Sequence, residues 1–387
     1  MPRSVLLPLM GFVKSFSNKA CFVIYMCGLL QLNAHAASLA PSGQSEESAT
    51  VDGAVILQYH HISEKTPPST STTPSKFAEH LELIEQQGFT VKSLPWVIQQ
   101  LQKKKPLPNK TVAITFDDGY LSIYEAAFPL LKERNWPFTI FISPEPIDKG
   151  FGDALNWDQL KEMQDAGATI ANHSYQHNYL LERLTNSNGE TESEAEWLAR
   201  TKKDILDTEQ RLLEKLGTSH KLIAYPYGEY NSALQTLVKE LGFIGLGQQS
   251  GPVGFYSDMT ALPRFPAAGI YANPVTLKTK MYTLPFHVLE QTQSTELADD
   301  EIPSLELVLS PNGFRATQIQ CFYQGKTIDT QTVTTNIDGQ QQIQVKATAS
   351  ALGKSRRHRY NCTAPAKDGK RYYWFSHSWL RSSEQDG

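Results

Sequence analysis

The chain has 387 residues, of which 36 are basic and 40 acidic, so its formal net charge at pH 7 is −4. Residues 37–300 carry 22 basic and 33 acidic side chains, a net charge of −11, whereas residues 301–387 carry 11 and 7, a net charge of +4. The sequence has no nucleic-acid-binding motif and no glycine-rich phosphate-binding loop of the usual spacing, which argues against a nucleic-acid partner and against the common nucleotide-binding classes.

Residues 1–36 have the features of a secretory signal peptide. They contain three basic residues, no acidic residue, and an apolar run from Ala20 to Leu32 that precedes a predicted cleavage after Ala36. We therefore expect an exported protein, periplasmic or extracellular, with no integral membrane span after signal removal. The apolar run continues past Cys27, which argues against a lipoprotein anchor. Residues 37–53 are predicted to be a polar linker.

Residues 54–295 alternate short apolar segments with amphipathic ones. Residues 111–116, for example, are β-branched and apolar, as is typical of a buried strand. Amphipathic helices are predicted near 75–88, 123–134, 158–166 and 192–216. This alternation predicts an α/β domain in which parallel strands form a barrel or curved sheet with helices outside it.

Two adjacent acidic residues, Asp117 and Asp118, follow the predicted strand at 111–116. Their carboxylates repel each other at a strand end unless a cation or a basic side chain lies between them. An Asp-Asp-Gly sequence by itself is more typical of a turn. The pair indicates a metal-dependent hydrolase only if further ligands are found elsewhere in the chain.

Two later strand ends also carry polar groups. One short apolar segment leads into His173 and His177, which on a helical turn would share one face and could bind one metal ion. Another leads into Pro226 and Tyr227, in a loop whose backbone N–H groups could face a developing oxyanion. In isolation these would be solvated histidines and a turn. Because parallel strands end at one rim, we expect the three groups to meet there.

From about residue 303 the sequence loses its helical period. Short segments rich in Thr, Val, Ile and Gln predict a small all-β, sandwich-like domain over 303–387. Signal removal would leave Cys321 and Cys362, which we expect to form a disulfide in an oxidising compartment. The basic run at 354–359 is most simply a solvated turn, and contact with anionic glycans, lipid headgroups or the preceding acidic domain is the alternative.

The segments 115–119, 173–177 and 224–228 resemble, in order and spacing, the first three motifs of the NodB-type polysaccharide deacetylases, carbohydrate esterase family 4. The resemblance covers roughly residues 54–290 and implies a distorted (β/α) barrel. The roles that it implies are Asp117 as catalytic base, Asp118, His173 and His177 as ligands of a divalent metal, and Tyr227, after Pro226, as an oxyanion-stabilising backbone donor.

The chain departs from the pattern of this family at two places. The Arg that usually braces the catalytic Asp from the third motif is replaced by Ala224, and we predict that Arg264 takes its place, with a surface position as the alternative. The Leu-x-His motif near the domain end is not recognisable. The general acid is then predicted to be His60, which ends the first strand, with His61 and His287 as weaker alternatives.

The Tyr-His sequence at 59–60, the third motif at 224–228 and the Pro-Arg-Phe sequence at 263–265 resemble those of the branch that deacetylates poly-β-1,6-N-acetylglucosamine in biofilm matrix. The expected reaction is metal-dependent hydrolysis of N-acetyl groups from an N-acetylglucosamine polysaccharide, which releases acetate. A divalent metal lowers the pKa of bound water from about 15.7 toward roughly 7 to 9. Two histidines and one carboxylate favour Zn²⁺, with Co²⁺, Ni²⁺ or Mn²⁺ as alternatives. The rival functions are an O-acetyl polysaccharide esterase and a catalytically silent glycan-binding matrix protein.

Overall fold

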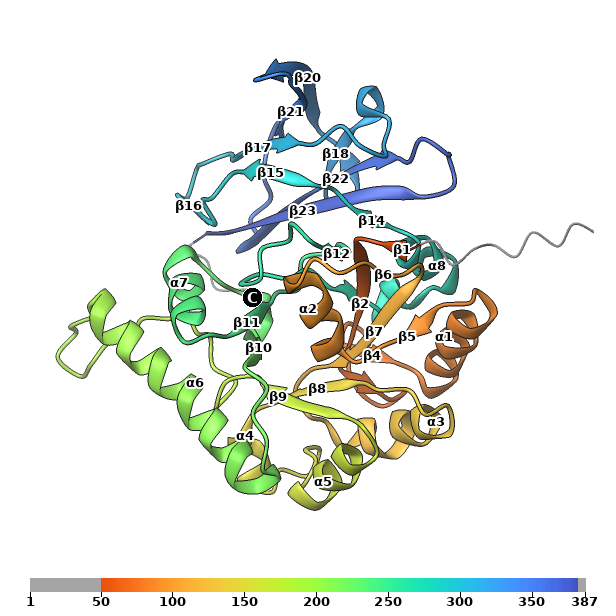
Figure 1. Cartoon of the computed structure of the whole chain (residues 1–387). Helices are drawn as coiled ribbons and strands as arrows, with labels where there is room; N and C mark the ends of the chain where they lie inside the picture. Colours follow the sequence, from red (N-terminus) through yellow and green to blue (C-terminus); the bar gives the residue numbers. More distant parts are fainter. Residues whose placement is uncertain (1–49, 382–387) are drawn as a thin grey trace, which may run out of the picture. The chain divides into compact units, whose positions relative to one another are not determined.

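Among residues 50–381, which the computed structural model describes, nine strands form a mainly parallel sheet (Figure 1). Its order is β11-β10-β9-β8-β7-β2-β12, with β5 beside β7 and β13 beside β2, and β12 alone is antiparallel to its neighbour. The strands are β2 (Gly53–Tyr59), β5 (Thr90–Val91), β7 (Thr111–Phe116), β8 (Thr139–Ile142), β9 (Thr169–Asn172), β10 (Leu222–Ala224), β11 (Ile244–Leu246), β12 (Val253–Gly254) and β13 (Phe265–Pro266). The predicted signal peptide and most of the predicted linker lie outside the described residues.

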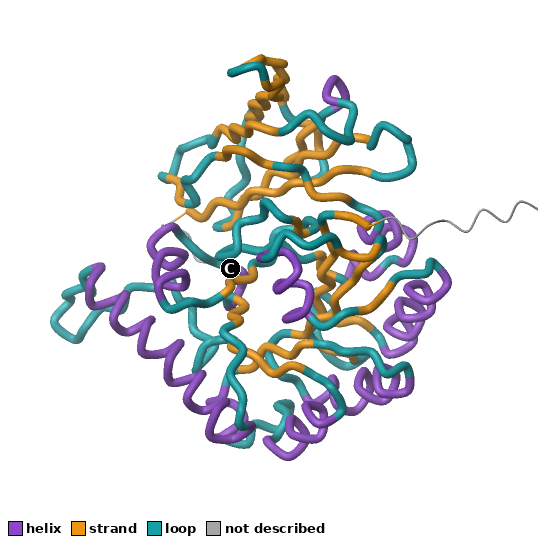
Figure 2. Tube along the Cα trace, in the orientation of Figure 1, coloured by secondary structure: helices purple, strands orange, loops and turns teal. Residues whose placement is uncertain are grey.

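Most helices lie on the outer side of this curved sheet, whereas α2 (Leu94–Gln102) lies within the ring of strands, as Figure 2 shows. It packs there against strand residues such as Ala113 and Ala171. The other helices are α1 (Pro74–Gln86), α3 (Phe128–Glu133), α4 (Pro144–Asp148), α5 (Trp157–Asp165), α6 (Glu194–Leu216), α7 (Ser232–Glu240) and α8 (Pro274–Met281). The four helices expected from the sequence are all present, the second as a π-helical turn at Ile123–Ala127 that runs into α3. In the described part of the chain, no helix combines the length and the hydropathy that a membrane span requires.

The longest helix, α6, shows why these segments are helical. Ser193 and Glu196 form a capping box at its start, and Gly217, at φ 71°, ends it in the left-handed conformation that glycine adopts without strain. Trp197, Ile205 and Leu212 form its buried stripe. This stripe packs on the outside of the sheet, while the charged faces of α6 remain in water.

The segment 262–265 connects β11, at one edge of the sheet, with β2, near the other edge. Leu262 forms a parallel bridge with Leu246 of β11, and Phe265 in β13 pairs with Leu57 of β2. The residues between them therefore cross the open side of the barrel, with Arg264 at the centre of the crossing. Two smaller pairings lie beside the array, β1 (Thr50–Val51) with β6 (Leu107–Pro108) and β3 (His61–Ile62) with β4 (Ser71–Thr72).

The C-terminal region consists of two packed sheets. One has the order β14-β23-β22-β18-β19 with β16 on β23, and the other has the order β15-β17-β21-β20. The strands are β14 (Leu284–Pro285), β15 (Val288–Gln291), β16 (Glu296–Leu297), β17 (Ser304–Leu309), β18 (Gln320–Tyr323), β19 (Lys326–Thr327), β20 (Asp329–Ile337), β21 (Gln340–Thr348), β22 (Arg357–Pro365) and β23 (Tyr372–Arg381). Because β14 to β16 pair only with these strands, we propose that the second domain begins near residue 284 rather than at 303.

The predicted disulfide between Cys321 and Cys362 is present. The two cysteines are a cross-strand pair of β18 and β22, and both are buried. They lie in an apolar cluster with Leu305 and Leu307 of the opposite sheet. The disulfide therefore lies in the core of the sandwich, where its own sheet packs against the facing one.

Candidate active site

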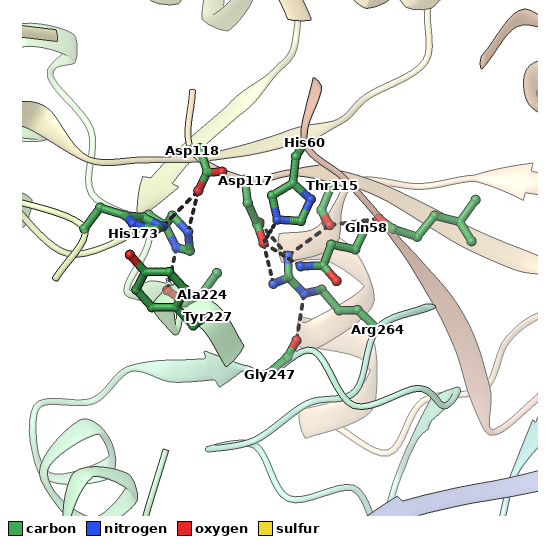
Figure 3. Close-up of polar contacts among 12 residues, drawn as sticks. Gln58, His60, Thr115, Asp117, Asp118, His173, Ala224, Tyr227, Gly247 and Arg264 are labelled. Carbon is green, nitrogen blue, oxygen red and sulfur yellow. Dashed lines mark hydrogen bonds and ion pairs between the residues drawn. The ribbon is translucent and has the colours of Figure 1, made fainter. Parts of the chain in front are cut away.

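The carboxyl ends of four strands bring polar residues to one rim of the barrel (Figure 3). The carboxyl ends of β2, β7, β9 and β10 lead to His60, to Asp117 and Asp118, to His173 and to the loop at Tyr227. These strands are parallel, so their carboxyl ends lie on the same side of the sheet. The structure thus brings together all the residues that the sequence assigned to the site.

Asp118, His173 and His177 form a compact group whose atoms could ligate a metal ion, called here the metal-ligating group. Oδ1 of Asp118 lies 3.1 Å from Nε2 of His173 and 3.0 Å from Nε2 of His177. One ligand atom from each residue lies within 4.8 Å of the other two. Burial alone would raise the pKa of Asp118, but hydrogen bonds from the two histidines hold it well below its usual value.

The hydrogen bonds of His173 show that this group fits a cation. Its Nδ1 lies 2.8 Å from the carbonyl oxygen of Ala224, which can only accept, so Nδ1 carries a proton. In a neutral ring the lone pair of Nε2 then points at the negative oxygen of Asp118, and the two repel each other unless a positive charge lies between them. Without a metal a proton has this role: burial would lower the pKa of His173, but the bond to Asp118 raises it. A metal ion would replace that proton.

The two histidines converge through an irregular loop. The interpretation of His173 to His177 as a helical turn is wrong, because the segment contains bends and no helix. Ser174 and His177 adopt positive φ values, 63° and 59°. The loop is held by Asn172, which accepts from the Ser174 amide at 2.8 Å, and by the Ser174 hydroxyl, which accepts from the His177 amide at 3.0 Å. These hydrogen bonds from backbone amides to side chains, rather than a helical turn, therefore bring the two histidines together.

Asp117 lies outside the metal-ligating group and is bound by Arg264. The guanidinium donates from Nη1 to Oδ1 at 2.6 Å and from Nη2 to Oδ2 at 2.8 Å, and neither side chain is exposed. Gln58 also donates to Oδ2, at 2.7 Å. Burial alone would raise the pKa of Asp117, but Arg264 holds it below its usual range. The predicted contact between Arg264 and Asp117 is therefore present, and the surface alternative for Arg264 is wrong.

Among the three histidines considered as general acid, His60 lies nearest to Asp117. Its Nε2 is 3.9 Å from Oδ2 of Asp117, beyond a hydrogen bond, and its side chain is 17% exposed. His61 is buried and stacks on Tyr120, with ring centroids 3.5 Å apart. His287 lies between β14 and β15 of the C-terminal sheets and stacks on Tyr256, with ring centroids 3.3 Å apart.

The loop after β10 is a tight turn centred on Tyr227, which has φ 58°. The amides of Gly228 and Glu229 donate to the carbonyls of Tyr225 and Pro226. In the described part of the chain, the Tyr227 amide has no hydrogen-bond partner. The Tyr227 ring stacks on Tyr179 at 3.8 Å and meets the ring of His177 edge-on at 4.9 Å. The turn therefore presents one free N–H group beside the histidine loop.

Two contributors to the site were missed from the sequence. Gln58 donates to Asp117, and Thr115 receives a hydrogen bond from Arg264 at 3.3 Å. Gln58 had a usable signal, because it is the polar member of the otherwise apolar strand β2 and is buried there. Thr115 had none, because a threonine is ordinary in a strand.

Residues 104–245 match the family model for polysaccharide deacetylase. A poly-β-1,6-N-acetyl-D-glucosamine N-deacetylase of Escherichia coli (strain K12) is 26% identical over 259 residues, which cover 59% of this chain and 38% of that protein. The chain therefore spans less than half the length of this relative. A protein of the same name from Staphylococcus aureus (strain MSSA476) is 29% identical over 208 residues, 49% of this chain and 70% of that protein.

A solved structure, the Streptococcus pyogenes deacetylase PplD in complex with acetate, superposes with a TM-score of 0.53. The sequences are 23% identical, and the match covers 60% of this chain and 99% of the other. This similarity confirms the predicted distorted barrel of the deacetylase type. The additional strand-rich region that follows it is seen in the two C-terminal sheets of this chain.

Proposed function

From the premise that this chain contains a polysaccharide deacetylase domain, we propose that it is a metal-dependent N-deacetylase of an N-acetylglucosamine polysaccharide. The observation that carries the proposal is the division of two adjacent carboxylates between two settings. Asp118 lies with two imidazoles, while Asp117 lies 2.6 Å from a buried guanidinium. One carboxylate is thus suited to hold a metal ion and the other to accept a proton.

Asp118, His173 and His177 are the residues that would hold the metal. A bound divalent ion supplies Lewis-acid chemistry there: it lowers the pKa of a water molecule and polarises the acetyl carbonyl. Two imidazoles and one carboxylate favour Zn²⁺, and Co²⁺, Ni²⁺ or Mn²⁺ could also bind such a set. The bond from His173 Nδ1 to the Ala224 carbonyl fixes the tautomer that leaves Nε2 free to bind.

Asp117 is proposed as the general base. Its lowered pKa keeps it ionised at neutral pH, so it can accept a proton from water. Arg264 and Gln58 together donate three hydrogen bonds to its two oxygens, which fix the plane of the carboxylate. The free amide of Tyr227 is proposed to donate to the oxyanion that forms at the acetyl carbonyl.

His60 is proposed as the general acid that protonates the leaving sugar nitrogen. An amine leaves poorly without a proton, whereas an activated ester with an acidic leaving group hardly needs one. We expect His60→Ala to lower kcat about 10²-fold or more on N-acetylglucosamine oligomers and to change the rate on an activated acetyl ester less than about tenfold. Steady-state kinetics with both substrates test this, and equal losses would remove His60 from the role.

The substrate proposal is poly-β-1,6-N-acetylglucosamine. It is supported by the names of the relatives from E. coli and S. aureus, each matched over about half of this chain. The test is acetate release by the purified protein from a panel of β-1,6 and β-1,4 N-acetylglucosamine oligomers, peptidoglycan and acetylated xylan. We expect the β-1,6 oligomers to be the preferred substrate. Preference for acetylated xylan would identify an O-acetyl esterase instead, and no release from any of them would favour a silent glycan-binding protein.

We also propose that the protein acts outside the cytoplasm. The disulfide between Cys321 and Cys362 supports this, because such bonds persist in oxidising compartments. The proposed polymer is likewise an extracellular material.

A further inference from the structure

The basic run after β21 contacts the turn centred on Tyr227. Arg357 is the first residue of β22 in the C-terminal region, and Arg356 directly precedes it. They are 127 and 130 residues away in sequence from their partners, Glu229 for Arg356 and Tyr227 for Arg357. The first expectation for this run, a solvated turn, is therefore wrong for Arg356, which is partly buried, whereas Arg357 is exposed and also contacts the barrel. The alternative, contact with the preceding domain, is confirmed.

Arg356 forms a paired contact with Glu229, the residue that follows the turn. Its Nε lies 3.0 Å from Oε1 and its Nη2 lies 3.0 Å from Oε2, the two-pronged geometry in which a guanidinium holds a carboxylate in one orientation. Glu229 is 2% exposed and the Arg356 side chain 16% exposed, so water screens this pair little. The C-terminal end of the turn is thereby anchored to β22.

Arg357 contacts the turn at its centre. Its Nη1 donates to the carbonyl oxygen of Tyr227 at 3.0 Å. Tyr227 has φ 58°, a conformation that disfavours any residue with a Cβ atom and that persists only when the surroundings enforce it. A bond to its carbonyl restrains the backbone at the residue whose own amide is free.

We propose that the C-terminal β domain positions the oxyanion-stabilising amide of Tyr227 through Arg356 and Arg357. The inference rests on the proposed deacetylase function for its catalytic consequence, but the restraint of the turn can be measured without substrate. In this view Arg356 and Arg357 are positioning residues. They act on the geometry of one backbone N–H group through their contacts with Glu229 and with the Tyr227 carbonyl.

A second contact between the C-terminal domain and the barrel serves as a control. It separates the effect of attaching the domain to the barrel from the effect of restraining the turn at Tyr227. Arg371 donates to the side chain of Asn109 at 2.9 Å and to the carbonyl of Tyr282 at 2.6 Å. Asn109 precedes β7 and so lies at the amino end of that strand, the end opposite Asp117. Loss of Arg371 weakens the attachment of the domain without reaching the rim that carries the site.

The test compares two variants, Arg357→Ala and Arg356→Met, with two matched controls. One control is Lys354→Ala, at an exposed residue of the same basic run, and the other is Arg371→Ala. Hydrogen–deuterium exchange of peptides covering 225–231 should become faster in the first two variants and stay unchanged in the controls. Because an oxyanion donor acts mainly in the transition state, kcat should fall about fivefold for Arg357→Ala and about tenfold or more for Arg356→Met, with KM and Zn²⁺ affinity near the wild-type values. Arg357→Lys, which keeps one donor, should recover most of the rate.

The outcomes separate this inference from the proposed function. Unchanged exchange at 225–231 in Arg357→Ala overturns the positioning role, whatever the activity of the wild-type protein. A loss of kcat in Arg371→Ala equal to that in Arg357→Ala also overturns it, because docking would then explain both. A wild-type protein that releases no acetate defeats the proposed function while the exchange experiment still reports on the turn. Arg357→Ala is the decisive variant if Arg356→Met does not fold.

Discussion

Asp117→Asn is expected to lower acetate release about 10²- to 10⁴-fold while leaving Zn²⁺ binding unchanged. The amide cannot take a proton from water, yet it has the size and shape of the carboxylate. The proposed metal ligands are Asp118, His173 and His177, so the substitution removes none of them. Kinetics on N-acetylglucosamine oligomers and a parallel Zn²⁺ titration measure the two properties. Full activity in this variant would show that Asp117 is not the base.

The same substitution should also destabilise the fold, because Arg264 is left buried without a counter-charge. Removal of one partner of a buried ion pair costs about 3–5 kcal/mol of unfolding free energy. The double variant Asp117→Asn/Arg264→Met removes the unpaired charge as well, and it should recover most of the lost stability without recovering activity. Urea denaturation of both variants measures this. If activity followed stability, the loss in Asp117→Asn would be structural rather than catalytic.

Chelation of the metal is expected to reduce acetate release to background, and added Zn²⁺ or Co²⁺ should restore it. The far-UV circular dichroism should not change, because an apolar core that includes Phe77, Phe116 and Ile140 holds the barrel together. The bond from His173 to the Ala224 carbonyl likewise needs no metal. Inductively coupled plasma mass spectrometry of the chelated protein would show whether activity and metal content fall together.

His177→Ala is the control for the chelation experiment. It removes one of the three ligands and leaves the buried His173 in place. Loss of a supporting residue around a metal site typically lowers affinity or activity about 10- to 100-fold, and loss of a ligand should cost at least as much. Restoration of this variant should therefore need at least about tenfold more Zn²⁺. Equal restoration of wild type and variant would exclude His177 as a ligand.

The sequence predicts those site residues that directly follow a strand. Asp117, Asp118, His60 and His173 follow parallel strands directly, and such strands end at one rim. The replacement of the third-motif arginine by Ala224 required another cation for Asp117. Arg264 was predictable as that cation because the chain returns to the same rim at about residue 264.

Other features depended on loop geometry and on pairing between distant segments, which the sequence does not display. The approach of His177 to His173 needs two left-handed residues, and a helical spacing was the only local pattern available to explain it. The short strands at 284–297 lack any period long enough to assign them to the barrel or to the C-terminal sheets. The contacts of Arg356 and Arg357 depend on how two distant segments pack.

The crossing segment that carries Arg264 has a consequence for the order in which the site is completed. The three proposed metal ligands all precede residue 178, whereas Arg264, the ion-pair partner of Asp117, follows Asp117 by 147 residues, on the segment between Leu262 and Phe265. Contacts of such long sequence separation form late, because the loop they close must first lose its freedom. A nascent chain would therefore acquire its ion-binding residues before its proton acceptor is neutralised by Arg264, and hydrolytic competence would coincide with completion of the barrel.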